Sequence, residues 1–167
     1  MVFVYLYVII KYILHEEKTV EYRKYGDAYY VRMDRDDEII DGIFTLCKKE
    51  NIASCTFSGI GGCGHATIQT FLPKTGTFET REIAGLLELV SLTGNVVMDG
   101  NGTRYHHTHA VFAYKDGEEH QIAAGHIKDI TVSYTAEIVV KPVPGVIGRT
   151  FDPETGTGFW NFTSLKK

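Results

Sequence analysis

Three histidines are the residues of this chain whose type and spacing best fit metal chemistry. His107 and His109 are two residues apart, so on a β-strand their side chains project from the same face. His126 follows after one tight turn. This turn is predicted at residues 115–118, because Asp-Gly favours a two-residue hairpin loop.

The register of this hairpin predicts that the three imidazoles converge. With Asp-Gly as the loop, His126 falls opposite His107, and Ala124 falls opposite His109. Directly opposed residues share a face, with Cβ atoms about 4.5–5.5 Å apart. Three neutral imidazole nitrogens suit zinc or another divalent transition metal and leave a fourth position open. A single β-bulge in the hairpin would move His126 to the opposite face.

The other histidines fit an ordinary structural role. A lone histidine on a strand is usually solvent-facing or satisfied by a neighbour, and we expect this of His15, His106 and His120. His65 stands beside a glycine-rich segment and is expected to be a polar loop residue. Its alternative is contact with a metal or ligand of a neighbouring subunit.

Glu88 is the carboxylate with the most unusual setting. It lies within Leu86–Leu92, a run that is apolar on both faces of a strand. A carboxylate buried there is costly unless it is paired or hydrogen-bonded. One interpretation is an outer partner of a metal-bound histidine, or an acid/base group in catalysis. The other is a structural carboxylate that accepts backbone N–H groups or pairs with Arg81 or Arg104.

Length, composition and charge limit the class of protein. A chain of 167 residues fits one domain, and 44% hydrophobic residues with mixed charge exclude disorder. The net charge of −4 speaks against dominant non-specific affinity for nucleic acid, which rests on Lys and Arg. Three cysteines without a Cys-x-x-Cys pair indicate reduced thiols, and hence a cytoplasmic protein.

The two ends of the chain differ from its middle. Residues 1–14 are almost wholly apolar, yet too short to cross a membrane and without the features of a signal peptide. We therefore predict no membrane span, and residues 1–19 as an apolar extension outside the domain. The domain is expected over residues 20–143. Residues 144–167 are expected to pack on it through Phe159, Trp160 and Phe162.

The elements that must position the histidines are mostly strands. One principal helix is predicted over about residues 37–50, because apolar residues recur there with helical spacing and Asp36 suits the N-cap. Two short strands are predicted around Gly26, and seven more near residues 53–60, 66–71, 78–83, 86–97, 103–114, 120–127 and 131–141. The pattern predicts a single α+β domain, a mostly antiparallel sheet with one principal helix.

Several separated motifs resemble one known family, the PPC (plants-and-prokaryotes-conserved) domain with its PD1-like DNA-binding members. The resemblance covers residues 22–140. The motifs are Ser58-Gly-Ile-Gly61, Thr80-Arg-Glu-Ile-Ala-Gly85, Leu87-Glu-Leu-Val-Ser-Leu-Thr-Gly94, His107-Thr-His109 and Gly125-His-Ile127, with a weaker echo in Arg149-Thr-Phe-Asp-Pro153. The fold is also similar to that of acetolactate decarboxylases, which hold zinc with a His-x-His plus His arrangement.

The resemblance implies a homotrimer with a metal held by His107, His109 and His126. It also implies a DNA-binding or regulatory role. The plant members carry AT-hooks that this chain lacks, and no residue here is singled out for DNA contact.

Two alternatives stay open beside the DNA-binding role. One is a zinc-dependent lyase or hydrolase that acts on a small oxo-acid, as acetolactate decarboxylase does, with Glu88 as a proton shuttle. The other is a metal that serves only as a structural staple.

Overall fold

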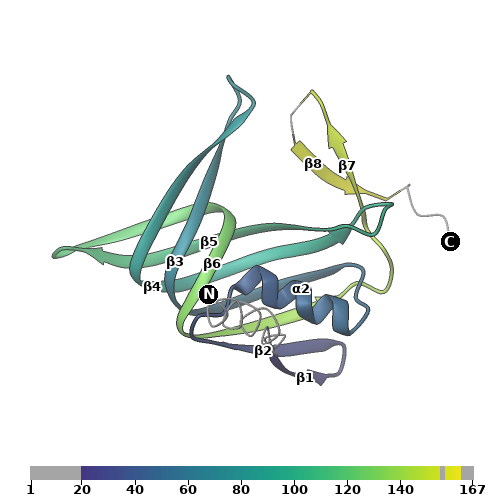
Figure 1. Cartoon of the computed structure of the whole chain (residues 1–167), viewed down its shortest axis with the longest axis horizontal. Coiled ribbons are helices and arrows are strands. Elements are labelled where there is room, and N and C mark those ends of the chain that lie inside the picture. Colours follow the sequence, from purple (N-terminus) through teal and green to yellow (C-terminus); the bar gives the residue numbers. More distant parts are fainter. Residues whose placement is uncertain (1–19, 155–156, 163–167) are drawn as a thin grey trace, which may run out of the picture.

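The computed structural model describes residues 20–154 and 157–162. In these residues one sheet of six strands runs in the order β1-β2-β6-β3-β4-β5, and a separate β7-β8 hairpin follows (Figure 1). The elements are β1 (Glu21–Tyr25), β2 (Ala28–Asp34), α2 (Ile39–Lys49), β3 (Cys55–Leu72), β4 (Thr77–Met98), β5 (Arg104–Asp116), β6 (Glu119–Pro142), β7 (Gly148–Asp152) and β8 (Thr157–Asn161). The predicted α+β fold is confirmed, with antiparallel pairing throughout.

Strands β3, β4 and β6 are long and continuous, so the prediction of separate short strands in these three stretches was wrong. In β3 the glycine-rich segment 59–64 bends the strand instead of ending it. A Cβ on Gly59 would lie 2.6 Å from the carbonyl oxygen of Glu137, and one on Gly61 would lie 2.6 Å from that of Thr135. Glycine therefore allows β3 to approach β6 closely.

The sheet closes on itself because β6 pairs with two partners. Residues 119–126 of β6 pair with β5, and residues 126–142 pair with β3. Strands β3, β4, β5 and β6 thus form a closed, barrel-like end (Figure 1). Its interior is filled by apolar side chains. Residues that point outward from this end alternate with those in the core.

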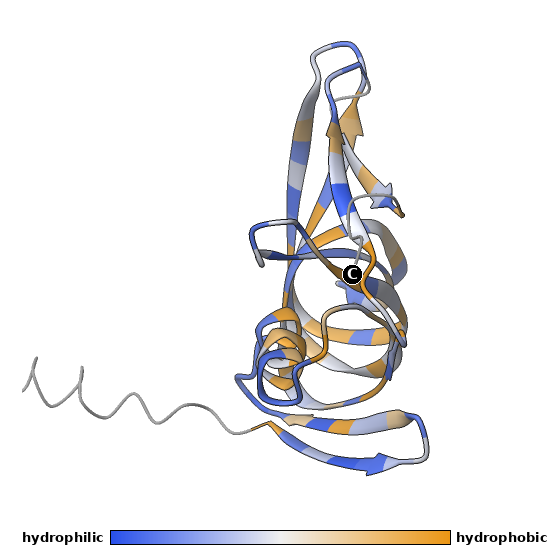
Figure 2. Cartoon of the chain, turned by 90° about the vertical axis from the view of Figure 1, so that its right-hand side faces the viewer, coloured by the Kyte–Doolittle hydropathy of each residue, from blue (hydrophilic) through white to orange (hydrophobic). Residues whose placement is uncertain are grey.

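Helix α2 packs its apolar face against the sheet (Figure 2). Its buried residues are Ile39, Ile40, Gly42, Ile43, Leu46 and Cys47. The helix begins two residues later than predicted, because Glu38 and not Asp36 is the N-cap. The Glu38 carboxylate accepts hydrogen bonds from the backbone N–H groups of Asp41 at 2.6 Å and Ile130 at 3.0 Å. One side chain therefore caps the helix and joins it to β6.

The β7-β8 hairpin lies beside the ends of β4 and β5 (Figure 1). The indole Nε1 of Trp160 donates a hydrogen bond to the Asn95 side-chain oxygen at 3.1 Å. The backbone N–H of Met98 donates to the carbonyl of Ile147 at 3.3 Å. Of the three predicted aromatic anchors, Trp160 makes this contact, while Phe162 is 74% exposed.

The predicted extension over residues 1–19 lies outside the described residues. In the part of the chain that the structure describes, no helix has the length and apolar character needed to cross a membrane.

Candidate metal centre

The three histidines come from two adjacent strands. His107 and His109 lie on the outward face of β5, and His126 lies on β6 beside them. His126 pairs with His109 and not with His107, because the chain reverses at residues 117–118, between Asp116 and Glu119. The predicted register was wrong by two residues. A shift of two leaves every side chain on its face, so the predicted convergence is still observed.

The ring nitrogens lie close enough to share one ion. The Nε2 atoms of His107 and His109 are 3.3 Å apart. One nitrogen from each of the three rings lies within 4.8 Å of the others, and the ring centroids are 5.1, 5.1 and 5.5 Å apart. Tetrahedral zinc with Zn–N bonds of about 2.0–2.1 Å places neighbouring nitrogens about 3.3 Å apart. The donor set and the distance between the nitrogens of His107 and His109 therefore fit zinc.

Burial and mutual proximity favour the neutral form of two of these rings. The pKa of His126 is lowered to about 4, first by partial burial of the ring and then by the neighbouring charges of His107, His109, His106 and Arg149. The pKa of His107 is lowered first by partial burial of its ring and then by the charges of His109 and Arg149. Neutral imidazole is the form that binds a metal, so both rings are ready for a cation at pH 7.

Residues of β4 lie directly beside the histidines. Thr93 pairs with His109, and Asn95 pairs with His107. The Phe78 ring packs 5.8 Å from the ring of His126. These neighbours were not predicted as part of the site. The nearby sequence contains no pattern that indicates them, because they come to lie beside the histidines only when β4 pairs with β5.

His106 points away from the cluster, as its predicted structural role requires. Its Nδ1 lies 3.0 Å from the hydroxyl of Thr108, and its ring packs 6.0 Å from Phe44 of the helix. His65 lies on strand β3 and not in the predicted loop. On β3, its ring nitrogens lie 3.6 Å from a carboxylate oxygen of Asp129 and 3.8 Å from one of Glu82.

Two adjoining hollows open beside the histidines. The first, of about 370 Å³, is lined by His107, His109, Asn95 and Trp160 among others. The second, of about 500 Å³, is lined by His107 together with Arg149 and the apolar side chains of the hairpin. A ligand in these hollows would have access to the open side of an ion held by the three rings.

Glu88 is not brought to the histidines within one chain. It pairs with Ala113, four residues along β5 from His109, and its side chain is exposed. It lines a separate hollow of about 580 Å³ with Ile60 and Val90. The expectation that Glu88 is buried was therefore wrong for the single chain, and its role in metal chemistry stays a prediction.

The Plants and Prokaryotes Conserved domain, abbreviated PCC or PPC, matches residues 20–144, and the chain belongs to this family. The predicted resemblance is thus confirmed. No curated protein matches the chain.

Solved structures with the same fold come from several organisms. A "putative DNA binding protein" from Bacteroides thetaiotaomicron is 28% identical, with a TM-score of 0.79 over 86% of this chain and 97% of that chain. A metal-containing protein from Archaeoglobus fulgidus is 27% identical, with a TM-score of 0.72 over 86% of this chain and 99% of that chain. A plant- and prokaryote-conserved (PPC) protein from Pyrococcus horikoshii is 27% identical, with a TM-score of 0.71 over 89% and 98%.

We predict that His126 of the metal-free protein titrates near pH 4, well below the ordinary histidine pKa of 6.5. Because the unfolded chain then binds more protons than the folded one, stability should fall as the pH drops from about 6.5 towards 4. NMR of the imidazole C–H resonances, assigned with a His126→Asn variant, measures the pKa, and thermal melts measure the stability. A midpoint at or above pH 6.5 would contradict the prediction.

Proposed function

We propose that this chain is a homotrimeric PPC-domain protein that binds one divalent metal ion, preferably zinc, in each subunit through His107, His109 and His126. The observation that carries the proposal is the set of three ring nitrogens within 4.8 Å of one another. The relative from Archaeoglobus fulgidus, described as a metal-containing protein, supports it. A divalent ion would also relieve the crowding of three imidazoles on one patch.

The donor set favours an open site over a purely structural one. Structural zinc is almost always held by four protein ligands, whereas catalytic zinc keeps three and an open fourth position. Among the described residues, the group that could hold a metal contains three histidines, two of them exposed. We therefore propose a site that accepts an exogenous ligand rather than a staple for the fold.

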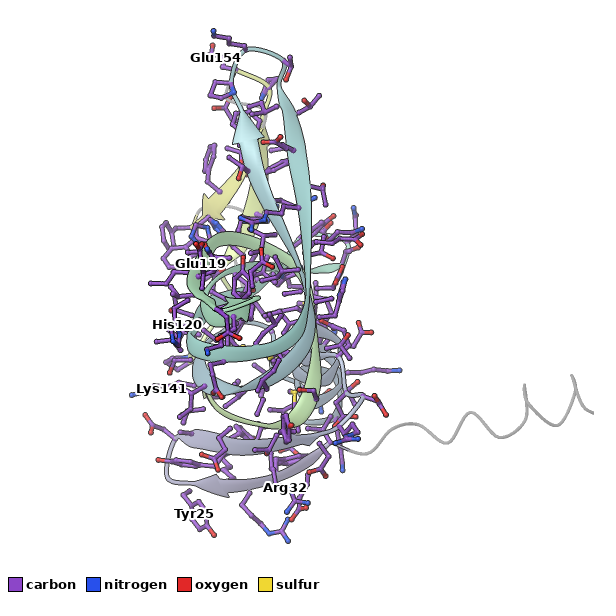
Figure 3. All side chains as sticks on the ribbon, turned by 90° about the vertical axis from the view of Figure 1, so that its left-hand side faces the viewer. Tyr25, Arg32, Glu119, His120, Lys141 and Glu154 are labelled. Atoms are coloured by element: carbon purple, nitrogen blue, oxygen red, sulfur yellow. The ribbon has the colours of Figure 1, made fainter. Side chains whose placement is uncertain are left out.

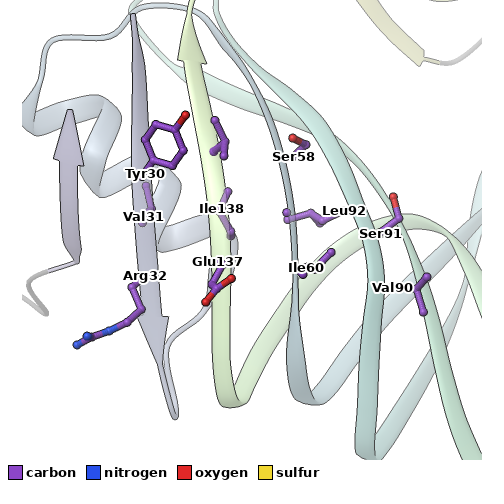
Figure 4. Close-up of a pocket in the computed structure, with 12 residues that line it drawn as sticks. Tyr30, Val31, Arg32, Ser58, Ile60, Val90, Ser91, Leu92, Glu137 and Ile138 are labelled. Atoms are coloured by element: carbon purple, nitrogen blue, oxygen red, sulfur yellow. The ribbon is translucent and has the colours of Figure 1, made fainter. Parts of the chain in front are cut away.

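The proposed trimer would cover an apolar area on the outward face of the sheet. Five large side chains on this face are between 51% and 62% exposed, namely Tyr30, Ile60, Leu86, Val90 and Tyr134. Tyr30, Ile60 and Val90 line a hollow of about 680 Å³ across β2, β6, β3 and β4 (Figure 4). Leu86 and Tyr134 line its neighbour of about 580 Å³. Exposed apolar areas of this kind usually mark contacts between proteins, and two further copies of the chain are the occupants we propose.

DNA binding is the role suggested by the name of the Bacteroides relative, and a regulatory role is the one that the family resemblance implies. The surface charges give this role limited support. Arg32 and Lys141, both labelled in Figure 3, are paired with carboxylates, Arg32 with Glu21 at 2.6 Å and Lys141 with Asp27 at 3.2 Å. Cations that are already paired contribute less to the phosphate contacts on which such binding depends.

A zinc-dependent lyase or hydrolase on a small oxo-acid is the second candidate function. The specific observation in its favour is the pair of hollows beside the histidines. A zinc ion with an open position would polarise a carbonyl group, or lower the pKa of bound water to about 7. Glu88 stays the proposed proton shuttle of this candidate, and from its place on β4 it would act near a neighbouring subunit.

Loss of one histidine ligand should abolish stable zinc binding. We expect His109→Ala and His126→Ala to bind zinc at least on the order of 100-fold more weakly than the parent, since even outer partners of a metal ligand contribute 10–100-fold. The parent should retain about one zinc per chain after dialysis, measured by elemental analysis. His120→Ala is the matched control and should keep its zinc. Full zinc content in His109→Ala would refute the proposed ligand set.

A charge placed in the apolar area should dissociate the trimer. We expect the parent to have about three times the 18.7 kDa mass of one chain, and Val90→Glu to shift towards the monomer, because a carboxylate cannot be buried unpaired. Light scattering coupled to size exclusion measures the mass. Val146→Glu, at an exposed loop position, is the control. A monomeric parent, or a trimeric Val90→Glu variant, would overturn the proposed interface.

DNA binding is tested by titrating duplex DNA at two salt concentrations. If DNA binding is the role, the trimer should bind at micromolar protein, and the affinity should fall as the salt concentration rises, because counterions are released. Fluorescence anisotropy of labelled DNA measures both. Absence of salt-sensitive binding would remove this role.

The enzyme candidate predicts turnover that depends on the metal. Decarboxylation or hydrolysis of a small oxo-acid should be lost on chelation and restored by zinc, since the ion supplies the electrophile or the activated water. Product formation by the parent and by His109→Ala is the measurement. Turnover that persists in the chelated protein would exclude this mechanism.

A further inference from the structure

The β7-β8 hairpin brings a guanidinium group to the edge of the candidate metal centre. Arg149 lies on β7 opposite Trp160 of β8, and its guanidinium stacks on the Tyr105 ring at 5.0 Å from the ring centroid. Arg149 and His107 line the same hollow of about 500 Å³. These hairpin residues lie beyond residue 144, where the match to the family domain ends.

Two features hold the guanidinium in this position. Gly158 has no side chain, and a Cβ there would lie 2.6 Å from both Cζ and Nη2 of Arg149. The guanidinium therefore occupies the space that a side chain on β8 would fill. The hydrogen bond from Trp160 to Asn95 then ties the hairpin to β4, at the residue that pairs with His107.

The positive charge of Arg149 would repel a metal ion held by the histidines if no anion lay between them. Arginine stays protonated at all pH values of interest, and none of the ion pairs found within residues 20–154 and 157–162 involves Arg149. A permanent cation repels a divalent ion, and an anion placed between the two reverses the sign of this interaction.

We infer that the hollow between His107 and Arg149 binds a small organic carboxylate, which bridges the open position of the metal ion and the guanidinium. This inference rests on the proposed metal site. The planar guanidinium matches a carboxylate with two parallel hydrogen bonds. Val97, Phe159 and the Trp160 indole supply apolar walls, which suit a short hydrocarbon body better than a phosphate dianion that needs further donors.

Cobalt-loaded protein provides a test that does not depend on catalysis. Co²⁺ takes the same ligands as zinc, and its visible absorption changes when a new ligand enters its coordination sphere. We expect isobutyrate to change the spectrum of the parent protein in a saturable way. Isobutyramide, which has the same shape and no charge, should leave the spectrum unchanged.

Variants of Arg149 separate the guanidinium from the metal. Arg149→Gln should keep the cobalt spectrum of the ligand-free protein and bind isobutyrate at least about tenfold more weakly, as expected for loss of a charge-assisted hydrogen bond. Arg149→Lys keeps the charge and should bind isobutyrate more tightly than Arg149→Gln. Arg23→Gln removes an exposed arginine elsewhere and should behave like the parent.

The outcomes distinguish failure of the proposed metal site from failure of the carboxylate site. Failure of the parent to bind cobalt would overturn the proposed metal site, and the carboxylate site with it. Cobalt binding without a response to isobutyrate would overturn the carboxylate site alone. The same conclusion would follow if Arg149→Gln and the parent bound isobutyrate equally, or if isobutyramide bound as well as isobutyrate.

Discussion

The antiparallel pairing of β5 with β6 is the constraint on which the rest of this structure depends. It closes the sheet, and it sets which side chains of both strands face outward. Phe112 on β5 and Ile127 on β6 are fully buried on the inward face. A slip of one residue would turn Ile127 outward and His126 inward, exposing an apolar side chain and burying an imidazole. The packing of the core therefore sets the geometry of the three histidines outside it.

The same alternation explains how far the sequence could predict this site. The convergence of the histidines follows from the parity of their positions, and it survives a register error of two residues in the turn. The full lengths of β3 and β4 could not be predicted, because glycines that bend a strand look like glycines that end one. The segment 59–64 is the clearest case, since its glycines serve close contact with β6. The break predicted in β6 at residues 128–130 contains no glycine, so this reason does not apply there.

Other features depend on contacts between distant parts of the chain, which local patterns do not report. Asn95, Arg149 and Trp160 meet near His107 only through the sheet and the C-terminal hairpin. The prediction that Glu88 is buried was wrong for a related reason. Its strand is apolar on both faces, which usually means burial on both faces, yet the outward face of β4 is exposed in the single chain. An apolar outward face of this kind is what association of subunits would bury.

The apolar area and the histidines share this outward face and are close neighbours on it. Ser58 lines the larger apolar hollow and pairs with Thr93, and Thr93 in turn pairs with His109. A subunit docked on the apolar area would therefore lie beside the open side of the metal centre. Excluding water there would lower the local dielectric constant. The proposed carboxylate would then be attracted more strongly to both the proposed metal ion and the Arg149 guanidinium. Assembly and ligand binding would then be coupled, because each would depend on the same strands, β3, β4 and β5.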